Sequence, residues 1–119
     1  MNSKILKNMN RVFMILSTAD KVVHEELSFP YAYNSMKQGW MDQVRIILWG
    51  PTERLAAEDK EFQELIKGWQ VAGVEVIACK ACSDNFGVSD KLEELGINVQ
   101  YVGTLVTEML KERWYQLTF

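Results

Sequence analysis

An apolar run that leads into a cysteine pair occupies residues 74–82, which read Val74-Glu75-Val76-Ile77-Ala78-Cys79-Lys80-Ala81-Cys82. The length and apolar content of its first part are typical of a β-strand. Cys79 would end this strand, and Cys82 would lie in the turn or first helical turn that follows it. Because catalytic groups and ligands of open α/β sheets gather at the carboxyl ends of the strands, this pair is the strongest chemical candidate in the chain.

Four further segments around this run are predicted to be strands. The first is apolar at five consecutive positions and the second is interrupted only by Arg45, as expected for strands covered on both faces of a parallel sheet. The five predicted strands are residues 12–17, 44–49, 74–79, 99–102 and 114–119.

Helical patterns separate these strands. The first has an apolar stripe, interrupted by Pro30, which should kink the helix or start its second part; the stripe is Val22, Phe29, Tyr33, Met36 and Trp40. The second begins at residues 50–52 and ends near Gly73, and a third covers about residues 89–95. The last should run from Thr104 to about Arg113, burying Leu105, Met109 and Leu110. The alternation predicts a single domain over residues 1–119, a three-layer α/β/α sandwich with a mainly parallel five-stranded sheet.

Composition and charge exclude several classes of protein. Of the 119 residues, 48% are hydrophobic and 24% are charged, which is typical of a globular protein and argues against disorder. The net charge of −3 and the scattered lysines and arginines argue against binding to nucleic acid or to anionic membranes. Residues 1–7 contain no apolar core of a signal peptide, so we expect a cytoplasmic protein. Glycine-rich phosphate-binding motifs are missing, so no cofactor is predicted.

The cysteine pair allows more than one interpretation. The start of a helix and the neighbouring Lys80 would lower a thiol pKa, which favours nucleophilic or redox chemistry and allows a disulfide between Cys79 and Cys82. Buried cysteines are, however, often inert small hydrophobic residues. A zinc site is not predicted, because two cysteines and the distant His24 fall short of four ligands. His24 is expected to be a surface or capping residue, and Asp20 to cap the helix that begins near Lys21.

Residues 74–88 resemble the active-cysteine segment of the DsrE/DsrF-like family, in which a cysteine ends an apolar strand and a glycine follows about eight positions later. Cys79 and Gly87 have this spacing, and the resemblance extends to residues 48–51 and 103–105. It implies a DsrE-like domain that assembles into homotrimers or hexamers. It also implies that Cys79 accepts sulfane sulfur as a persulfide and that Cys82 is the optional second cysteine of the family.

The favoured hypothesis is therefore a sulfur carrier or sulfurtransferase-like protein of sulfur relay, with donor and acceptor proteins as partners. Cys82 could resolve a persulfide on Cys79 by forming a disulfide and releasing sulfide. Two alternatives remain open from the residues alone. One is a non-catalytic oligomeric binding module with inert cysteines, and the other is a C-x-x-C dithiol–disulfide oxidoreductase.

Overall fold

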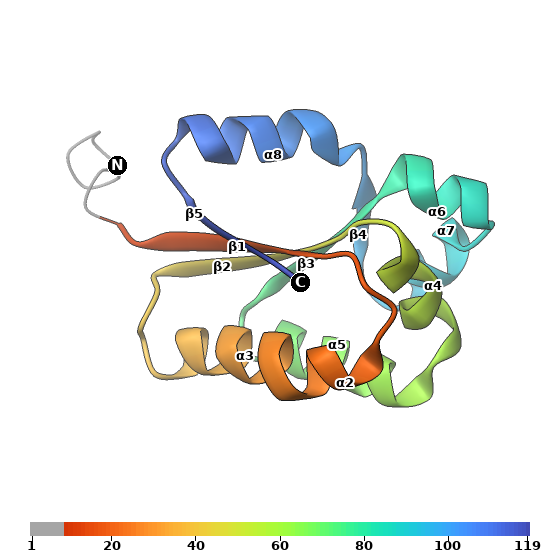
Figure 1. The fold of residues 1–119 in the computed structure, drawn as a ribbon, viewed down its shortest axis with the longest axis horizontal. Coiled ribbons are helices and arrows are strands. Elements are labelled where there is room, and N and C mark those ends of the chain that lie inside the picture. The colour runs from red at the N-terminus through yellow and green to blue at the C-terminus, as the bar shows by residue number, and fades with distance from the viewer. Residues whose placement is uncertain (1–8) are drawn as a thin grey trace.

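The computed structural model describes residues 9–119. Five strands form one sheet in the order β4-β3-β2-β1-β5, and every neighbouring pair is parallel (Figure 1). They are β1 (Arg11–Leu16), β2 (Gln43–Leu48), β3 (Glu75–Cys79), β4 (Asn98–Gln100) and β5 (Tyr115–Thr118). The predicted α/β fold with a parallel five-stranded sheet is confirmed. The prediction that residues 1–7 contain no signal sequence concerns residues that lie outside the described part of the chain.

Helices cover both faces of the sheet. Their bounds are α2 (Lys21–Val23), the π-helical turn η1 (His24–Ser28), α3 (Phe29–Lys37), α4 (Pro51–Glu58), α5 (Lys60–Val71), α6 (Lys80–Phe86), α7 (Ser89–Glu94) and α8 (Val102–Lys111). Figure 1 shows α3 and α5 on one face and α8 on the other. Strands β1 to β4 follow one another in a single direction, whereas β5 returns to the far side of β1. Right-handed crossovers therefore place α8 on the face opposite α3 and α5.

The ends of the helices confirm two local predictions and correct a third. Asp20 caps α2 by accepting a hydrogen bond from the Val22 amide at 3.0 Å, and Pro30 lies in the first turn of α3. Asp59 ends α4 and caps α5, accepting from the Phe62 amide at 2.8 Å, so the predicted second helix is two helices.

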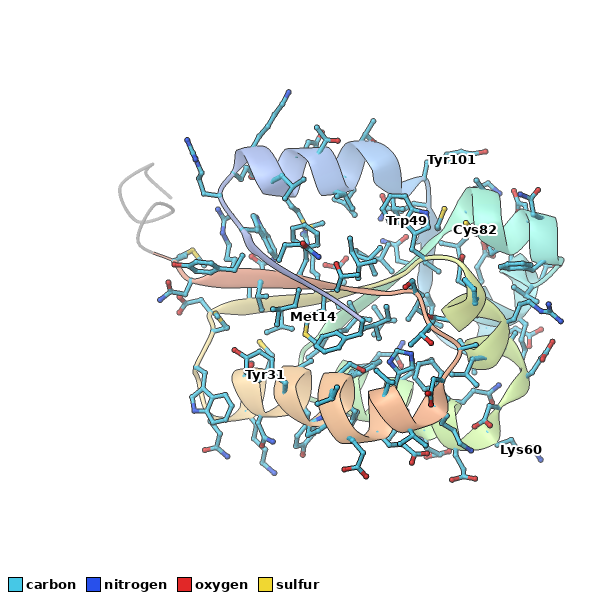
Figure 2. The ribbon with its side chains drawn as sticks, in the orientation of Figure 1. Met14, Tyr31, Trp49, Lys60, Cys82 and Tyr101 are labelled. Atoms are coloured by element: carbon cyan, nitrogen blue, oxygen red, sulfur yellow. The ribbon has the colours of Figure 1, made fainter. Side chains whose placement is uncertain are left out.

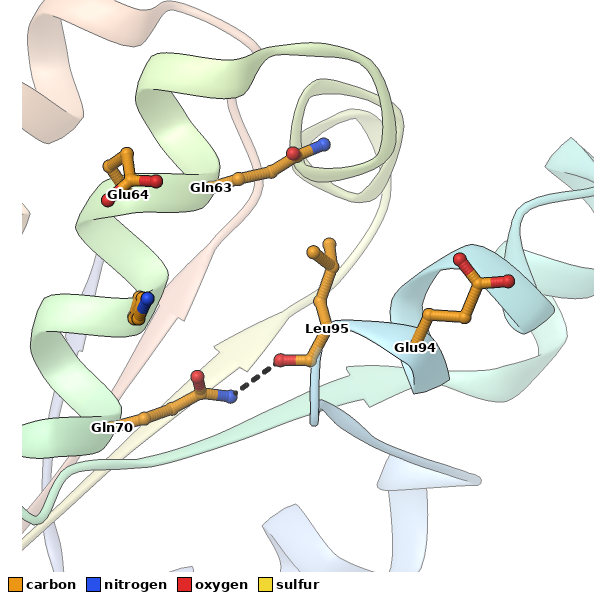
Figure 3. A pocket seen from close by; sticks show the side chains of 6 residues that line it. Gln63, Glu64, Gln70, Glu94 and Leu95 are labelled. Atoms are coloured by element: carbon orange, nitrogen blue, oxygen red, sulfur yellow. Dashed lines mark hydrogen bonds between the residues drawn. The ribbon is translucent and has the colours of Figure 1, made fainter.

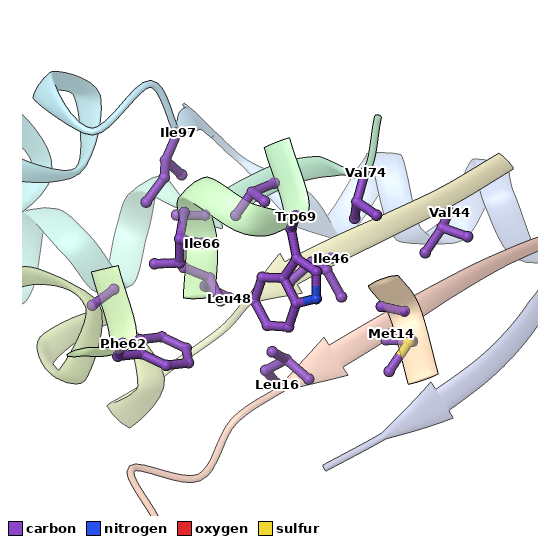
Figure 4. Close-up of a cluster of buried hydrophobic side chains, with 14 of the residues drawn as sticks. Met14, Leu16, Val44, Ile46, Leu48, Phe62, Ile66, Trp69, Val74 and Ile97 are labelled. Atoms are coloured by element: carbon purple, nitrogen blue, oxygen red, sulfur yellow. The ribbon is translucent and has the colours of Figure 1, made fainter. Parts of the chain in front are cut away.

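The larger hydrophobic core lies between the sheet and helices α3 and α5. Trp69 is fully buried at its centre, with its ring edge-on to Phe62 at 6.2 Å between centroids (Figure 4). Side chains of successive strand residues point to opposite faces, so Met14 packs in this core while Phe13 packs in the other. The larger core thus fixes the sheet against two helices.

The smaller core, between the sheet and α8, contains Cys79. The helix α8 begins two residues earlier than predicted, and its inward face presents Val102, Val106 and Met109. Leu110, predicted to be buried, is 51% exposed, because packing of α8 against the sheet selects the other rotation of the helix. Val22 and Trp40, predicted in the stripe of the first helix, are also exposed; Val22 belongs to the short helix α2, and Trp40 follows α3, which ends at Lys37. Within residues 9–119, no helix is long and apolar enough to cross a membrane.

Candidate functional site at the carboxyl edge of the sheet

Cys79 is the last residue of β3, where the parallel strands all end at the same edge. It pairs in register with Gln100 of β4 and is 5% exposed, and α6 begins at the very next residue. Cys82 follows in the first turn of α6 and is partly exposed. Cys82 and Trp49 pack against the cluster that holds Cys79, and Figure 2 shows these two side chains at the same end of the sheet. The predicted positions of both cysteines are thus observed.

Both cysteines are free thiols, and they interact with each other. Burial, the neighbouring Cys79 and then Glu53 together raise the pKa of Cys82 to about 12. The expectation that the site lowers a thiol pKa is therefore wrong for Cys82. The ammonium group of Lys80, which was expected to lower a thiol pKa, instead lies 3.1 Å from the carboxylate of Asp84. Cys82 is protonated at neutral pH and would need a base before it could act as a nucleophile.

Glu53 is a buried carboxyl group at this edge, and the sequence interpretation missed it. It lies in the first turn of α4 and is 0% exposed. Its Oε2 accepts a hydrogen bond from the Gly50 amide at 3.1 Å, which is the glutamate half of a capping box, because Gly50 has no side chain to make the other half. Among residues 9–119, its Oε1 has no hydrogen-bond partner of ordinary geometry. The signal that could have revealed this residue is the spacing of Glu53 three positions after Gly50.

Burial raises the pKa of Glu53 to about 7, while the Gly50 amide and the Cys82 thiol act in the opposite direction by favouring the carboxylate. A carboxyl group with this pKa exchanges its proton near neutrality, which is the range in which general acids and bases work best. The site therefore combines a thiol that holds its proton tightly with a neighbouring group that can accept one.

His24 lies near the same edge, as the C-cap residue of α2; its predicted surface position is wrong, whereas the capping alternative is observed. The imidazole is fully buried, with Nε2 2.8 Å from the Thr18 carbonyl and Nδ1 2.9 Å from the Ser28 hydroxyl. A carbonyl can only accept, so Nε2 carries the hydrogen and the Ser28 hydroxyl donates to Nδ1. Burial lowers the pKa of His24. These bonds make His24 a structural support for the loop after β1.

The Thr18 carbonyl also joins this loop to α4, because it accepts a second hydrogen bond from the Thr52 hydroxyl at 2.8 Å. The Thr52 amide donates to the Ser17 carbonyl at 3.1 Å. The turn at residues 50–52, predicted as the start of a helix, is thereby held against the end of β1. The backbone of Glu53, the next residue, is therefore held in a fixed position relative to the end of β1.

Two hollows of the surface lie away from the cysteines. One of about 300 Å³ lies between α5 and α7, where Gln70 donates to the Leu95 carbonyl at 3.1 Å (Figure 3). Another lies along α8 beside Thr104 and Lys111. Within residues 9–119, no group of three or more histidine, cysteine, aspartate or glutamate side chains is arranged to hold a metal ion.

The fold and the site define a class of small parallel α/β proteins with a cysteine at the end of a central strand. The model of the DsrE/DsrF-like family matches residues 11–119, and the chain belongs to this family. This membership confirms the resemblance carried by Cys79 and Gly87.

Solved structures that are similar to this chain include the following three. A conserved protein of unknown function from Bacteroides thetaiotaomicron, BT1422, has 34% identity and a TM-score of 0.89, over 92% of this chain and 95% of that one. The YchN protein from E. coli has 19% identity and a TM-score of 0.69, over 93% and 99%. MTH1491 from Methanobacterium thermoautotrophicum, a protein of unknown function, has 22% identity and a TM-score of 0.71, over 94% and 100%. No curated protein matches the chain.

Proposed function

We propose that the protein is a sulfurtransferase-like sulfur carrier that holds sulfane sulfur as a persulfide on Cys79. The observation that carries the proposal is the position of Cys79 at the carboxyl end of β3, with Cys82 interacting with it, in a member of the DsrE/DsrF-like family. Strand-end positions of this kind are where parallel α/β proteins place reactive groups.

The reaction requires no cofactor. The thiolate of Cys79 attacks the outer sulfur of a donor persulfide, forming a bond between Cys79 Sγ and that sulfur, and the donor leaves as a thiolate with the electron pair of the broken bond. A thiolate of the acceptor then attacks the outer sulfur in the same way. Cys79 leaves as a thiolate, and the acceptor carries the persulfide.

Self-association is part of the proposal. Two apolar side chains of the edge strand β5, Tyr115 and Leu117, are exposed, as is Leu110 at the end of α8. Exposed apolar side chains next to an unpaired strand edge favour contact with another chain. A homotrimer or homohexamer would cover these side chains. Donor and acceptor proteins would bind at the carboxyl edge of the sheet, where Cys79 lies.

One observation favours a second candidate, a non-catalytic oligomeric binding module. Cys79 is nearly covered, and a buried cysteine with no access to reagents is a small hydrophobic residue of the core. The two candidates differ in whether the thiol of Cys79 reacts in the native protein.

Mass spectrometry of the intact protein separates them. The reduced protein is exposed briefly to polysulfide, and the adduct is located by peptide mapping. We expect one added sulfur atom on Cys79, no addition at this position in Cys79→Ser, and retained addition in the matched control Cys82→Ser. Sulfur uptake that persists in Cys79→Ser, or no uptake by the wild type, would contradict the carrier and favour the binding module.

A further inference from the structure

We propose that Glu53 is the proton acceptor for the Cys82 thiol when Cys82 attacks a sulfur atom bonded to Cys79, so that the three side chains form a disulfide-forming centre. The inference rests on the proposed function for its natural substrate. Its chemistry, however, requires only that an electrophilic sulfur is attached to Cys79.

The hydrogen bond at the helix start does not account for the second oxygen of Glu53. That bond uses Oε2 alone, and the side-chain oxygen of a glutamine could accept it too. Oε1 is left buried without an ordinary partner among residues 9–119, and burying an unpaired carboxyl oxygen costs free energy. The neighbouring group that interacts with this carboxyl is the thiol of Cys82. The thiol therefore gives the second carboxyl oxygen a role that the hydrogen bond at the helix start does not give it.

The thiol in turn requires a base. Cys82 stays protonated at neutral pH because burial and its two neighbours raise its pKa to about 12. A protonated thiol is a poor nucleophile, and attack becomes fast only when the proton is removed as the new sulfur–sulfur bond forms. Lys80 cannot fill this role, since its ammonium group is paired with Asp84 and offers no acceptor. Glu53, a fully buried carboxyl group whose Oε1 has no hydrogen-bond partner among residues 9–119, is a neighbour of Cys82 that can accept this proton.

The step balances without an external oxidant when Cys79 carries a persulfide. Cys82 Sγ attacks Cys79 Sγ, a bond forms between these two atoms, and the bond from Cys79 Sγ to the outer sulfur breaks with its electron pair on the outer sulfur. The proton of Cys82 passes to the Glu53 carboxylate and then to the departing hydrosulfide, which leaves as hydrogen sulfide. The two cysteine sulfurs are oxidised to a disulfide, the outer sulfur is reduced, and Glu53 ends as it began.

The test follows two successive thiol reactions with dithiodipyridine, a disulfide whose leaving group absorbs light and needs no proton from the protein. The first equivalent of pyridinethione reports formation of the mixed disulfide on Cys79, and the second reports its displacement by Cys82. Cys82→Ser assigns the second phase, which it should lack. Glu58→Gln is a matched control, because Glu58 is on the same helix but exposed.

We expect Glu53→Gln to leave the first phase unchanged and to slow the second by about 10²–10⁴-fold, the usual contribution of a general base. The second phase of the wild type should also be slower in D₂O, a measurement that does not depend on how well the variant folds. Equal second phases in wild type and Glu53→Gln, a rate independent of D₂O, or no second phase in the wild type would each overturn the inference.

The outcome is distinguishable from that of the proposed function. Two phases that depend on Glu53, in a protein that takes up no sulfane sulfur, would remove the carrier function and leave the disulfide-forming centre. Uptake of sulfane sulfur on Cys79, together with a second phase whose rate is the same in wild type and Glu53→Gln, would keep the carrier function and remove the role of Glu53 in the disulfide-forming centre.

Discussion

Replacing Glu53 with glutamine removes one ionisable group from the interior and changes little else. The side chains have nearly the same shape, and the amide oxygen of glutamine can still accept from the Gly50 amide, so the hydrogen bond at the helix start persists. The substitution therefore isolates the effect of the carboxyl proton on the free energy of unfolding.

The sign and size of that effect follow from the pKa of Glu53, which burial raises from 4.5 to about 7. The folded state prefers the protonated carboxyl, so its contribution to stability is fully present below about pH 4.5 and is lost as the pH rises through about 7. At about 1.4 kcal/mol per pKa unit, the loss amounts to about 3 kcal/mol. Glutamine has no such loss, so the variant should gain about 3 kcal/mol relative to wild type between pH 4.5 and pH 8.

Urea unfolding of wild type, Glu53→Gln and the exposed control Glu58→Gln at several pH values measures this difference. Other titrating groups, His24 included, contribute equally to wild type and variant and cancel in the comparison. A difference between wild type and Glu53→Gln that stays constant from pH 4.5 to pH 8 would refute the reasoning that burial holds the proton on Glu53.

Two further substitutions test the support of the site and the core. His24→Ala should destabilise the protein by about 2–4 kcal/mol at pH 8, because it leaves a cavity and removes bonds to Thr18 and Ser28. Since burial lowers the pKa of His24, its contribution is present above about pH 6.5 and lost as the pH falls below it, so the deficit in urea unfolding should shrink on acidification; a growing deficit would contradict this. Trp69→Ala should cost about 3–5 kcal/mol, as expected for a fully buried aromatic residue, and a loss below 1 kcal/mol measured by the same unfolding experiment would mean that Trp69 does not fill the core as described.

The strands and the order of elements could be predicted because they depend on local patterns. Consecutive apolar residues at 12–16 and 46–48 mark strands covered on both faces, and Asp20 and Pro30 mark helix starts through their own backbone chemistry. The position of Leu110 was predicted wrongly, because one apolar stripe on α8 fits two rotations of the helix and only packing against the sheet selects between them.

The candidate site was predictable in part for the same reason. The cysteine pair at the end of β3 is a local motif, whereas the burial of His24 depends on the Thr18 carbonyl and that of Glu53 on Gly50 and on Cys82, which is 29 residues further along the chain. A polar residue is expected at the surface from the sequence alone, and it is buried only where residues distant in the chain supply hydrogen-bond partners.

The first turn of α4 shows how the fold brings these distant groups together. Thr52 is fully buried and bonds the end of β1 through both its amide and its hydroxyl group, and Glu53 follows it directly. The carboxyl group is thus oriented by contacts with a strand of the sheet, while Cys82 is oriented by the helix that leaves β3. Because both supports belong to the same parallel sheet, the carboxyl and the thiol are held together before any substrate arrives. Such preorganisation is what a proton transfer requires, since a shift of about 1 Å in a reacting group can cost about 10²-fold in rate.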